Sequence, residues 1–417
     1  MAKIVDIKCR EILDSRGNPT VEAEVILDNG ISASASVPSG ASTGTHEAYE
    51  LRDNDFGRFN GLGVLKALDS IKSKIKPVLM GCEICNQEKI DKTLIDLDGT
   101  NNKGKLGANS ILAVSLSSAR TAALFLKLPL YKYIQKLSAN KYLKPTVTPL
   151  FNVINGGLHG SGKLDFQEFF IIPSPDKPFA QALQTGAELY QQLKKLLKSR
   201  KLYYSLGDEG GFTPNLETNI QALELLEQLI SASKYRYGQD VYLGIDLAAS
   251  VFYKDGNYLL NNSSNSFARD DFINYLADLK KKFCLYLLED PLFEDDWQGF
   301  SQLNGIIGED TLIVGDDLLV TNKQRLEKAI RQKACNSILI KVNQTGTLTE
   351  ALEVIRLAQK AKFKVVVSHR SGETNDDFIA DLAVGAGADY VKFGAPARGE
   401  RVAKYNRLLR IYGELNF

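Results

Sequence analysis

The chain has 417 residues, of which 44% are hydrophobic and 24% are charged, and its formal net charge is +1. This composition is ordinary for a globular protein with a large core, and the length predicts more than one domain. A nearly neutral chain produces no electrostatic field that would attract nucleic acid or an anionic membrane surface, so a small-molecule partner is expected.

The sequence also bears on cellular location. No stretch approaches the roughly 18 consecutive apolar residues of a membrane-spanning helix, and the first residues lack the apolar core of a signal peptide. The five cysteines are an odd number scattered along the chain, which fits free thiols in a reducing compartment. We therefore expect a cytoplasmic protein with no membrane insertion.

Residues 1–135 are expected to form a small α+β domain. Two segments, 20–27 and 31–37, alternate strictly between apolar and polar side chains, and the DNG sequence between them is typical of a hairpin. With the opening strand they predict a three-stranded antiparallel meander. Residues 107–126 predict a long apolar helix suited to burial. An earlier helical pattern places five apolar residues on one face: Val64, Leu65, Leu68, Ile71 and Ile75.

A second domain is expected over residues 141–417, after a polar linker at about 136–146. Short apolar runs at 166–172 and 241–247 predict strands, and the amphipathic segment 215–230 between them predicts a helix. This alternation of strands and helices indicates an α/β fold.

Six polar residues in this domain follow successive apolar runs. They are Asp246, Glu289, Asp316, Lys341, His369 and Lys392. The last five follow one another at intervals of 23 to 28 residues, which is the length of one strand, one helix and two short loops. In a (β/α)8 barrel the active site is built from residues at the C-terminal ends of different strands. A single charge at a strand end is also a common way to leave a sheet, but six in register predict a barrel with its active site at this mouth.

Three of these residues, Asp246, Glu289 and Asp316, offer only oxygen ligands, which suit Mg²⁺ and disfavour zinc. Alternatively, lysine and arginine neighbours neutralise the same carboxylates. Lys341 and Lys392 are expected across the mouth from them. A lysine beside divalent cations is pushed toward its neutral form, as a general base requires, but either lysine could equally be an ion-pair partner.

Two loops add candidates. Residues 205–215 place Asp208 and Glu209 before a Gly-Gly pair, which lets the backbone approach a ligand closely. This segment is equally typical of an acidic turn and of an acid catalyst. Residues 38–44 are rich in glycine and hydroxyl groups but lack the order of a P-loop, so a mobile lid is favoured over a phosphate cradle. All three histidines lie beside candidate site segments: His46, His159 and His369.

Specific motifs occur along nearly the whole chain. They are DSRGNPT (14–20), SGASTGTHEA (39–48), GANS (107–110), NVINGGLH (152–159), QEF (167–169), GDEGGF (207–212), EDP (289–291), EDDW (294–297), VGDDL (314–318), LIKVNQTGTLTEA (339–351), SHRSGET (368–374) and AKYNRLLRI (403–411). In these motifs the chain resembles the enolase family. The resemblance implies a small N-terminal α+β domain followed by a variant (β/α)8 TIM-type barrel of eight strands, whose first units depart from strict βα order.

The resemblance also implies an activity and an assembly. Enolases remove the C2 proton of 2-phospho-D-glycerate and then expel the C3 hydroxyl to give phosphoenolpyruvate, in glycolysis and gluconeogenesis. Fixed cations stabilise the extra negative charge of the intermediate. Two Mg²⁺ ions per active site are implied as cofactors, and a homodimer or an octamer of dimers is implied as the assembly.

The site residues implied by the resemblance divide by role. The ligands of the first Mg²⁺ match Asp246, Glu289 and Asp316, and a ligand of the second matches Ser42. The base matches Lys341, and the general acid matches Glu209 with Glu168 in support. The phosphate-binding pair matches Arg370 and Ser371. The remaining substrate contacts match His159, Gln167, His369 and Lys392, of which Lys392 would neutralise the substrate carboxylate.

The chain departs from the family pattern at Gly160, Val251, Phe393 and Gly399, none of which is a matched catalytic position. Phe393 follows Lys392 directly, so strand alternation predicts that its side chain packs outward against the helix layer. Two rival functions remain. One is a racemase or cycloisomerase of the same barrel superfamily, although those usually lack the loop at 39–44 and the acid of GDEGG. The other is a paralogue retained for binding or structure.

Overall fold

The N-terminal part of the chain forms the predicted three-stranded antiparallel sheet. The computed structural model describes residues 2–40, 46–157, 160, 163–261 and 266–415. The strands are β1 (Ile4–Leu13), β2 (Pro19–Leu27) and β3 (Ser32–Ser36), in the order β1-β2-β3. The alternation of β2 buries Val21, Ala23 and Val25 on one face, and α4 (Ala108–Phe125) packs against β2 and β3. α4 is buried over nearly its whole length, as its apolar sequence predicts.

The predicted apolar stripe of residues 64–75 is correct except for Leu65, which is 48% exposed. Successive helical residues are rotated by about 100°, so Leu65 lies to one side of a stripe that starts at the buried Val64. The helix also contains a π-helical turn. The helical segments of this part are a 3-10 turn (Phe59–Gly61), α1 (Leu65–Asp69), the π turn (Ser70–Ile75), α2 (Lys76–Leu79), α3 (Gln87–Asp98), α4 and α5 (Leu130–Ser138).

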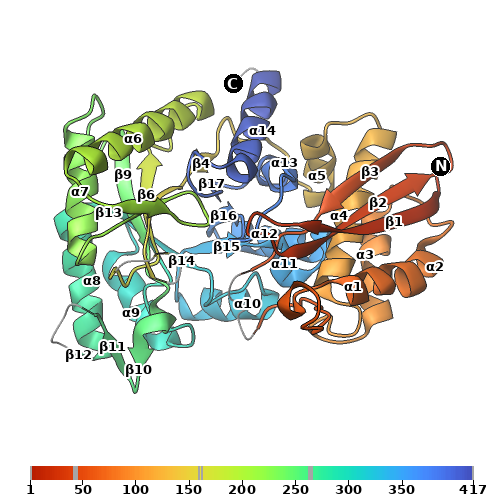
Figure 1. Ribbon diagram of the computed structural model, residues 1–417, viewed down its shortest axis with the longest axis horizontal. Helices are drawn as coiled ribbons and strands as arrows, with labels where there is room; N and C mark the ends of the chain where they lie inside the picture. The colour runs from red at the N-terminus through yellow and green to blue at the C-terminus, as the bar shows by residue number, and fades with distance from the viewer. Residues whose placement is uncertain (1, 41–45, 158–159, 161–162, 262–265, 416–417) are drawn as a thin grey trace.

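A curled sheet surrounded by helices follows (Figure 1). Its main strands are β4 (Thr148–Pro149), β5 (Phe151–Asn155), β6 (Glu168–Pro173), β9 (Val241–Asp246), β13 (Leu285–Glu289), β14 (Leu312–Gly315), β15 (Ser337–Ile340), β16 (Lys364–Ser368) and β17 (Tyr390–Lys392). The helices are α6 (Phe179–Ser199), α7 (Asn219–Ser231), α8 (Arg269–Phe283), α9 (Trp297–Ile307), α10 (Lys323–Gln332), α11 (Val342–Thr345), α12 (Leu348–Lys360), α13 (Phe378–Gly385) and α14 (Gly399–Leu415).

Short elements decorate this sheet. The hairpin of β7 (Tyr204–Leu206) and β8 (Phe212–Pro214) extends its edge beside β5. A separate small sheet contains β10 (Tyr253–Lys254), β11 (Asn257–Leu259) and β12 (Ser266–Phe267), after a 3-10 turn (Ala249–Phe252).

The strand order confirms a barrel whose first units depart from strict βα order. β6 runs antiparallel to both β5 and β9, whereas β9, β13, β14, β15, β16, β17 and β4 are parallel. β4 pairs with β17, and β5, which follows after one residue, pairs with β6, so this stretch closes the sheet. With β4 and β5 counted as one, the described residues place eight strands around the barrel: β4–β5, β6, β9, β13, β14, β15, β16 and β17.

The barrel interior is a packed core. It contains one cluster of buried side chains contributed by strands all around the sheet: Leu150, Phe170, Ile172, Leu287, Val314, Leu339, Val366 and Tyr390. Such layers leave no pore, so ligands must bind at the mouth. Asp246, Glu289 and Lys392 are the last residues of their strands, and Asp316, Lys341 and His369 each follow a strand directly. The six predicted residues therefore lie at one end of the barrel.

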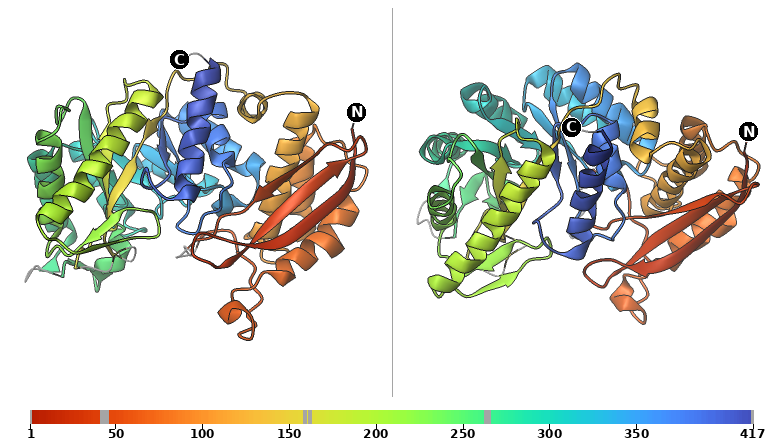
Figure 2. Two further views of the ribbon diagram at one scale, coloured as in Figure 1. Left: turned by 45° about the horizontal axis from the view of Figure 1, so that its top comes forward. Right: turned by 90° about the horizontal axis from the view of Figure 1, so that it is seen from above.

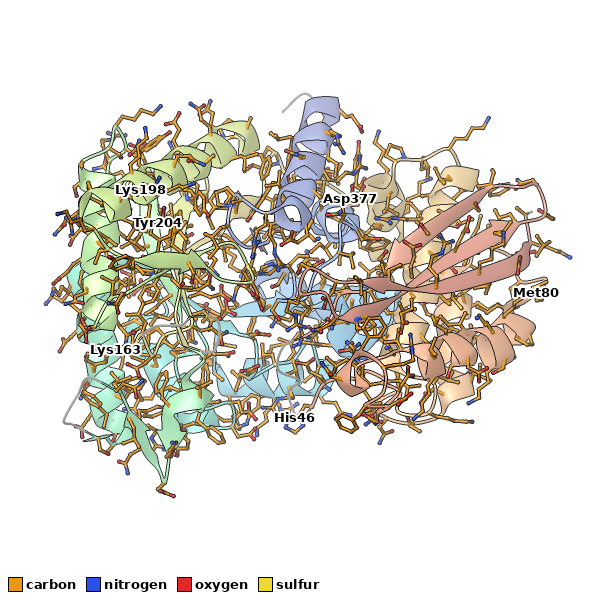
Figure 3. The ribbon with its side chains drawn as sticks, viewed as in Figure 1. His46, Met80, Lys163, Lys198, Tyr204 and Asp377 are labelled. Atoms are coloured by element: carbon orange, nitrogen blue, oxygen red, sulfur yellow. The ribbon has the colours of Figure 1, made fainter. Side chains whose placement is uncertain are left out.

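The N-terminal sheet and its helices pack beside the barrel, as two further views show (Figure 2). Arg120 on α4 crosses this junction and donates hydrogen bonds to Asp376 at 2.7 and 2.8 Å and to Asp377 at 2.9 Å. Asp377 is labelled beside the junction in Figure 3. α5 continues to Ser138, so the predicted linker at 136–146 begins too early. In the described part of the chain, no single helix has the length and apolar character to cross a bilayer; one pair, α4 and α5, bent by 109°, meets those criteria jointly.

Candidate active site

A cavity at the C-terminal mouth of the barrel collects most of the predicted residues. Among those singled out from the sequence, it is lined by Gln167, Glu168, Glu209, Asp246, Asp316, Lys341, His369, Arg370, Ser371 and Lys392. Glu289, at the end of β13, is fully buried next to this group. The parallel register of β9 and β13 pairs Asp246 with Glu289, which brings their carboxylates to the same edge. The lining also includes Glu47, Val251, Asp290 and Asp317.

Lys392 lies in the middle of the carboxylates. Its Nζ is 2.8 Å from Glu289 Oε1, 3.0 Å from Asp246 Oδ2 and 3.3 Å from Glu168 Oε2. Only 3% of Lys392 is exposed, so the ammonium has exchanged water for carboxylate oxygens. Burial lowers the pKa of Lys392, but these carboxylates outweigh burial and raise it well above its usual value. Gln167 Nε2 adds a contact of 3.3 Å to Asp246 Oδ2.

The donor set fits a divalent cation. Burial raises the pKa of Glu289 well above its usual value, and the adjacent Asp246 carboxylate raises it further, because one lysine does not neutralise so many acids. Glu289 Oε2 is buried and has no hydrogen-bond partner among the described residues. An orphaned carboxylate oxygen in an oxygen-only, acid-rich pocket is what a hard cation such as Mg²⁺ would ligate. Glu289, beside Asp246, offers such an oxygen. The metal role of Asp246, Glu289 and Asp316 together stays a prediction.

A second carboxylate group lies beside the first. Oxygens of Asp290, Asp316 and Asp317 all lie within 4.8 Å of one another and could also hold a metal ion. Asp290, however, already accepts hydrogen bonds from the backbone N–H groups of Asp316 at 3.1 Å and Asp317 at 2.7 Å. Asp290 thus ties the ends of β13 and β14 together. Burial, reinforced by Asp316, raises the pKa of Asp317 to about 7.

Lys341 is paired with Asp316 through a short contact between its Nζ and Asp316 Oδ2. Burial lowers the pKa of Lys341, but the nearby carboxylates, Asp316 above all and also Asp317, together outweigh it, and the pKa is raised. The nearest charge to Lys341 is therefore a carboxylate. The prediction that divalent cations push Lys341 toward its neutral form concerns the metal-bound site and stays a prediction.

Glu209 lies in the turn between β7 and β8 and is 3% exposed. Asn152 Nδ2 donates a hydrogen bond of 2.9 Å to Glu209 Oε2, and His369 Nε2 lies 3.6 Å from the same oxygen. The glycine pair beside it serves packing: a Cβ on Gly211 would lie 2.3 Å from Asn155 Oδ1. Glu209 is thus a buried carboxyl inside the cavity and not an exposed acidic turn.

Arg370, predicted to bind phosphate, is 5% exposed and holds an internal carboxylate. Its Nη1 lies 2.8 Å from Glu47 Oε2 and 3.1 Å from Asn343 Oδ1, and its Nη2 lies 3.3 Å from Glu47 Oε1. Glu47 comes from the N-terminal part of the chain, so this arginine of the barrel is paired with a residue of the other domain. Ser371 lines the same cavity.

Other predicted positions have different surroundings. Ser42 and His159 lie outside the described residues, as does most of the loop at 38–44. His46 is exposed at the lower edge of the molecule and lines a different cavity, so it is not part of this site (Figure 3). Phe393 is fully buried with its ring 5.8 Å from that of Tyr405 on α14, which confirms the outward packing predicted for it.

Several residues of the site were not predicted. Asp290 and Asp317 directly follow predicted residues in EDP and VGDDL, so their motifs were a usable signal. Glu47 lies in the motif SGASTGTHEA, but nothing in the sequence indicated that Arg370 is its partner. Arg401, from α14, contacts His369 and the backbone of residues 370 and 371. No local pattern marks it, because its partners lie 30 to 32 residues earlier in the chain, before α13 and β17.

The fold and this cavity define a TIM-barrel protein with acid and base groups gathered at the C-terminal ends of its strands. Comparison with known families narrows the class. The enolase N-terminal domain matches residues 4–134, and the enolase C-terminal TIM barrel domain matches residues 144–416. Because these matches cover nearly the whole chain, the protein belongs to the enolase family.

Proposed function

We propose that the chain catalyses the reversible, Mg²⁺-dependent dehydration of 2-phospho-D-glycerate to phosphoenolpyruvate, the hydro-lyase step of glycolysis and gluconeogenesis. The observation that carries the proposal is that Lys341, Glu209 and Arg370 line one cavity beside a cluster of buried carboxylates. A base, an acid and an anion-binding group are the three functions that this elimination requires.

Lys341 is proposed as the base that removes the C2 proton. Its ammonium is held on Asp316, so it must lose a proton before it can accept one. Asp246, Glu289, Asp316 and Ser42 would hold the two Mg²⁺ ions, which supply positive charge to stabilise the extra negative charge on the substrate carboxylate. When Asp316 engages another cation, Lys341 loses the partner that favours its charged form.

Glu209 is proposed as the acid that protonates the departing C3 hydroxyl. Glu209 is buried beside His369, whereas Lys341 is held on Asp316, so the acid and the base have separate surroundings, as two-step acid–base chemistry requires. Glu168, which contacts Lys392 at 3.3 Å, would support it electrostatically. Asn152 keeps the Glu209 carboxyl in place from β5.

The substrate would lie between these groups. Arg370 and Ser371 would bind the phosphate, because a guanidinium offers two parallel N–H donors to phosphate oxygens. Lys392 would neutralise the substrate carboxylate, and His369, Gln167 and His159 would complete the contacts. This arrangement uses a small anionic molecule as partner and requires no nucleic acid.

The test is formation of phosphoenolpyruvate from 2-phosphoglycerate, followed by ultraviolet absorbance with Mg²⁺ and with EDTA. We expect activity with Mg²⁺, loss of activity with EDTA, and recovery when Mg²⁺ is restored in excess. No product from the folded, Mg²⁺-supplied protein would refute the proposed reaction. Full activity in metal-free buffer would refute the metal role of Asp246, Glu289 and Asp316.

We also propose a homodimer, or an octamer of dimers, as the assembly, and the cytoplasm as the location. Both follow from what the family resemblance implies and from the composition of the chain. Light scattering coupled to gel filtration would measure the mass of the assembly directly. A monomer at micromolar concentration would contradict the first of these proposals.

A further inference from the structure

Arg401 on α14 is a fully buried arginine whose guanidinium is directed at the active-site strand end. Its Nη1 donates to the Arg370 carbonyl at 2.6 Å, and its Nη2 donates to the carbonyls of Ser371 at 2.6 Å and Asp208 at 3.1 Å. Arg401 is 0% exposed. Burying a charged group is costly unless its hydrogen bonds are satisfied. The carbonyl groups of residues 208, 370 and 371 satisfy those of the Arg401 Nη groups and so fix its position.

The same Nη1 lies 2.7 Å from Nδ1 of His369. A guanidinium carries only N–H donors and is not deprotonated in proteins, so Nδ1 must be the acceptor in this contact. An accepting Nδ1 carries no proton. The single proton of a neutral imidazole then lies on Nε2, and a charged imidazolium would place an N–H against the N–H of Arg401.

Burial and the two nearby cations act in the same sense. Burial lowers the pKa of His369 to about 3; the Glu209 carboxylate opposes this shift, whereas Arg401 and Lys392 reinforce it. His369 therefore stays neutral over the ordinary pH range. Its Nε2 is buried and has no hydrogen-bond partner among the described residues, and it lies 3.6 Å from Glu209 Oε2. The ring thus presents a fixed N–H donor into the cavity, beside the proposed acid.

We propose that Arg401 is a positioning residue that fixes His369 as the neutral Nε2–H tautomer, so that His369 donates a hydrogen bond to the oxygen that leaves the substrate beside Glu209. The role of the donor rests on the proposed function, whereas the tautomer does not. Glu209 delivers the proton, and His369 stabilises the developing charge on the same oxygen without losing its own proton. Removing one such donor typically lowers kcat by about 100-fold.

The tautomer can be measured directly by two-bond ¹H–¹⁵N correlation of the imidazole rings. The chain has only three histidines, and the His369 signals are identified by their loss in His369→Asn. We expect the Nε2–H tautomer above and below the ordinary histidine pKa of about 6.5. An Nδ1–H tautomer, or an imidazolium just below that pH, would overturn the proposal even if the enzyme makes phosphoenolpyruvate. Failure to make product would overturn the proposed function and leave the tautomer result standing.

Variants test the effect on catalysis. Arg401→Met removes the donors, and Arg401→Leu is a second such variant if the first does not fold; Arg401→Lys keeps the charge and an N–H donor and is the conservative control. In whichever neutral variant folds, we expect His369 to titrate nearer its ordinary pKa, kcat to gain an acid limb in addition to any that the wild type shows, and KM to change less than about threefold, with Arg401→Lys closer to the wild type. A variant that loses stability but keeps the wild-type tautomer and the wild-type pH profile would show a merely structural role and overturn the proposal.

Discussion

Phe393 is the departure from the family pattern that lies nearest to the proposed active site. Replacing it with threonine tests whether this side chain affects the site or only the core. Phe393 is fully buried, and its ring packs on Tyr405, which in turn packs on Phe151 at 5.2 Å between ring centroids. Truncating a buried phenylalanine to alanine costs about 3 to 5 kcal/mol. Threonine refills part of the volume but buries a hydroxyl, so we expect a loss of about 2 to 3 kcal/mol in the free energy of unfolding.

The site should be unaffected, because Lys392 and Phe393 point to opposite sides of the strand end. KM for 2-phosphoglycerate should therefore change by less than about twofold, since none of the contacts proposed for the substrate is removed. Urea denaturation measures the stability, and Phe393→Leu is the matched control, with an expected cost of about 1 kcal/mol. A tenfold change in KM with unchanged unfolding free energy would refute outward packing.

Three further outcomes are expected. Lys341→Ala should abolish exchange of the C2 proton with solvent deuterium, whereas Glu209→Gln should block dehydration and keep the exchange; equal loss of exchange in both folded variants would contradict separate roles. The pKa of His369 is about 6.5 in the unfolded chain but about 3 in the folded chain. The free energy of unfolding therefore decreases as the pH falls between these values, by about 2 kcal/mol from pH 6.5 to 5. Denaturant titrations of His369→Asn should lack this part of the decrease. Gly186→Ala should cost about 1 to 3 kcal/mol, since its Cβ would lie 2.2 Å from a buried aromatic ring, whereas Gly305→Ala, inside α9 with nothing within 4 Å, should stabilise by up to about 1 kcal/mol.

The barrel and its mouth could be predicted because strand-end residues recur with the βα period. Glu289 and Lys392 end their strands where the period places them, Asp246 ends an earlier strand, and the parallel pairing of β9 with β13 brings Asp246 beside Glu289. Of the two interpretations of the lysines, ion pairing is found for both: Lys392 contacts carboxylates at 2.8 to 3.3 Å, and Lys341 is paired with Asp316. The general-base role stays a proposal.

What the sequence could not predict are contacts between distant segments. Arg401 meets His369 because α14 crosses back over the strand end, and no spacing within either segment encodes that approach. The raised pKa of Lys341 has the same origin, since only the folded geometry shows that Asp316 is its nearest charge. The exposed Leu65 has a different cause. A helical pattern predicts which side of a helix is apolar but not how wide a part of that side is buried.

The contact between Glu47 and Arg370 bears on selectivity. Glu47 is covalently part of the chain, so it acts as a tethered competitor whose local concentration at the guanidinium is high. Any anion that binds there must displace a carboxylate held at 2.8 Å. A singly charged anion gains little by that exchange, whereas a dianionic phosphate brings additional charge and an additional acceptor oxygen. If Arg370 binds the phosphate as proposed, the other domain would thus set a threshold that weak anions do not pass, and the site would discriminate by displacement as well as by fit.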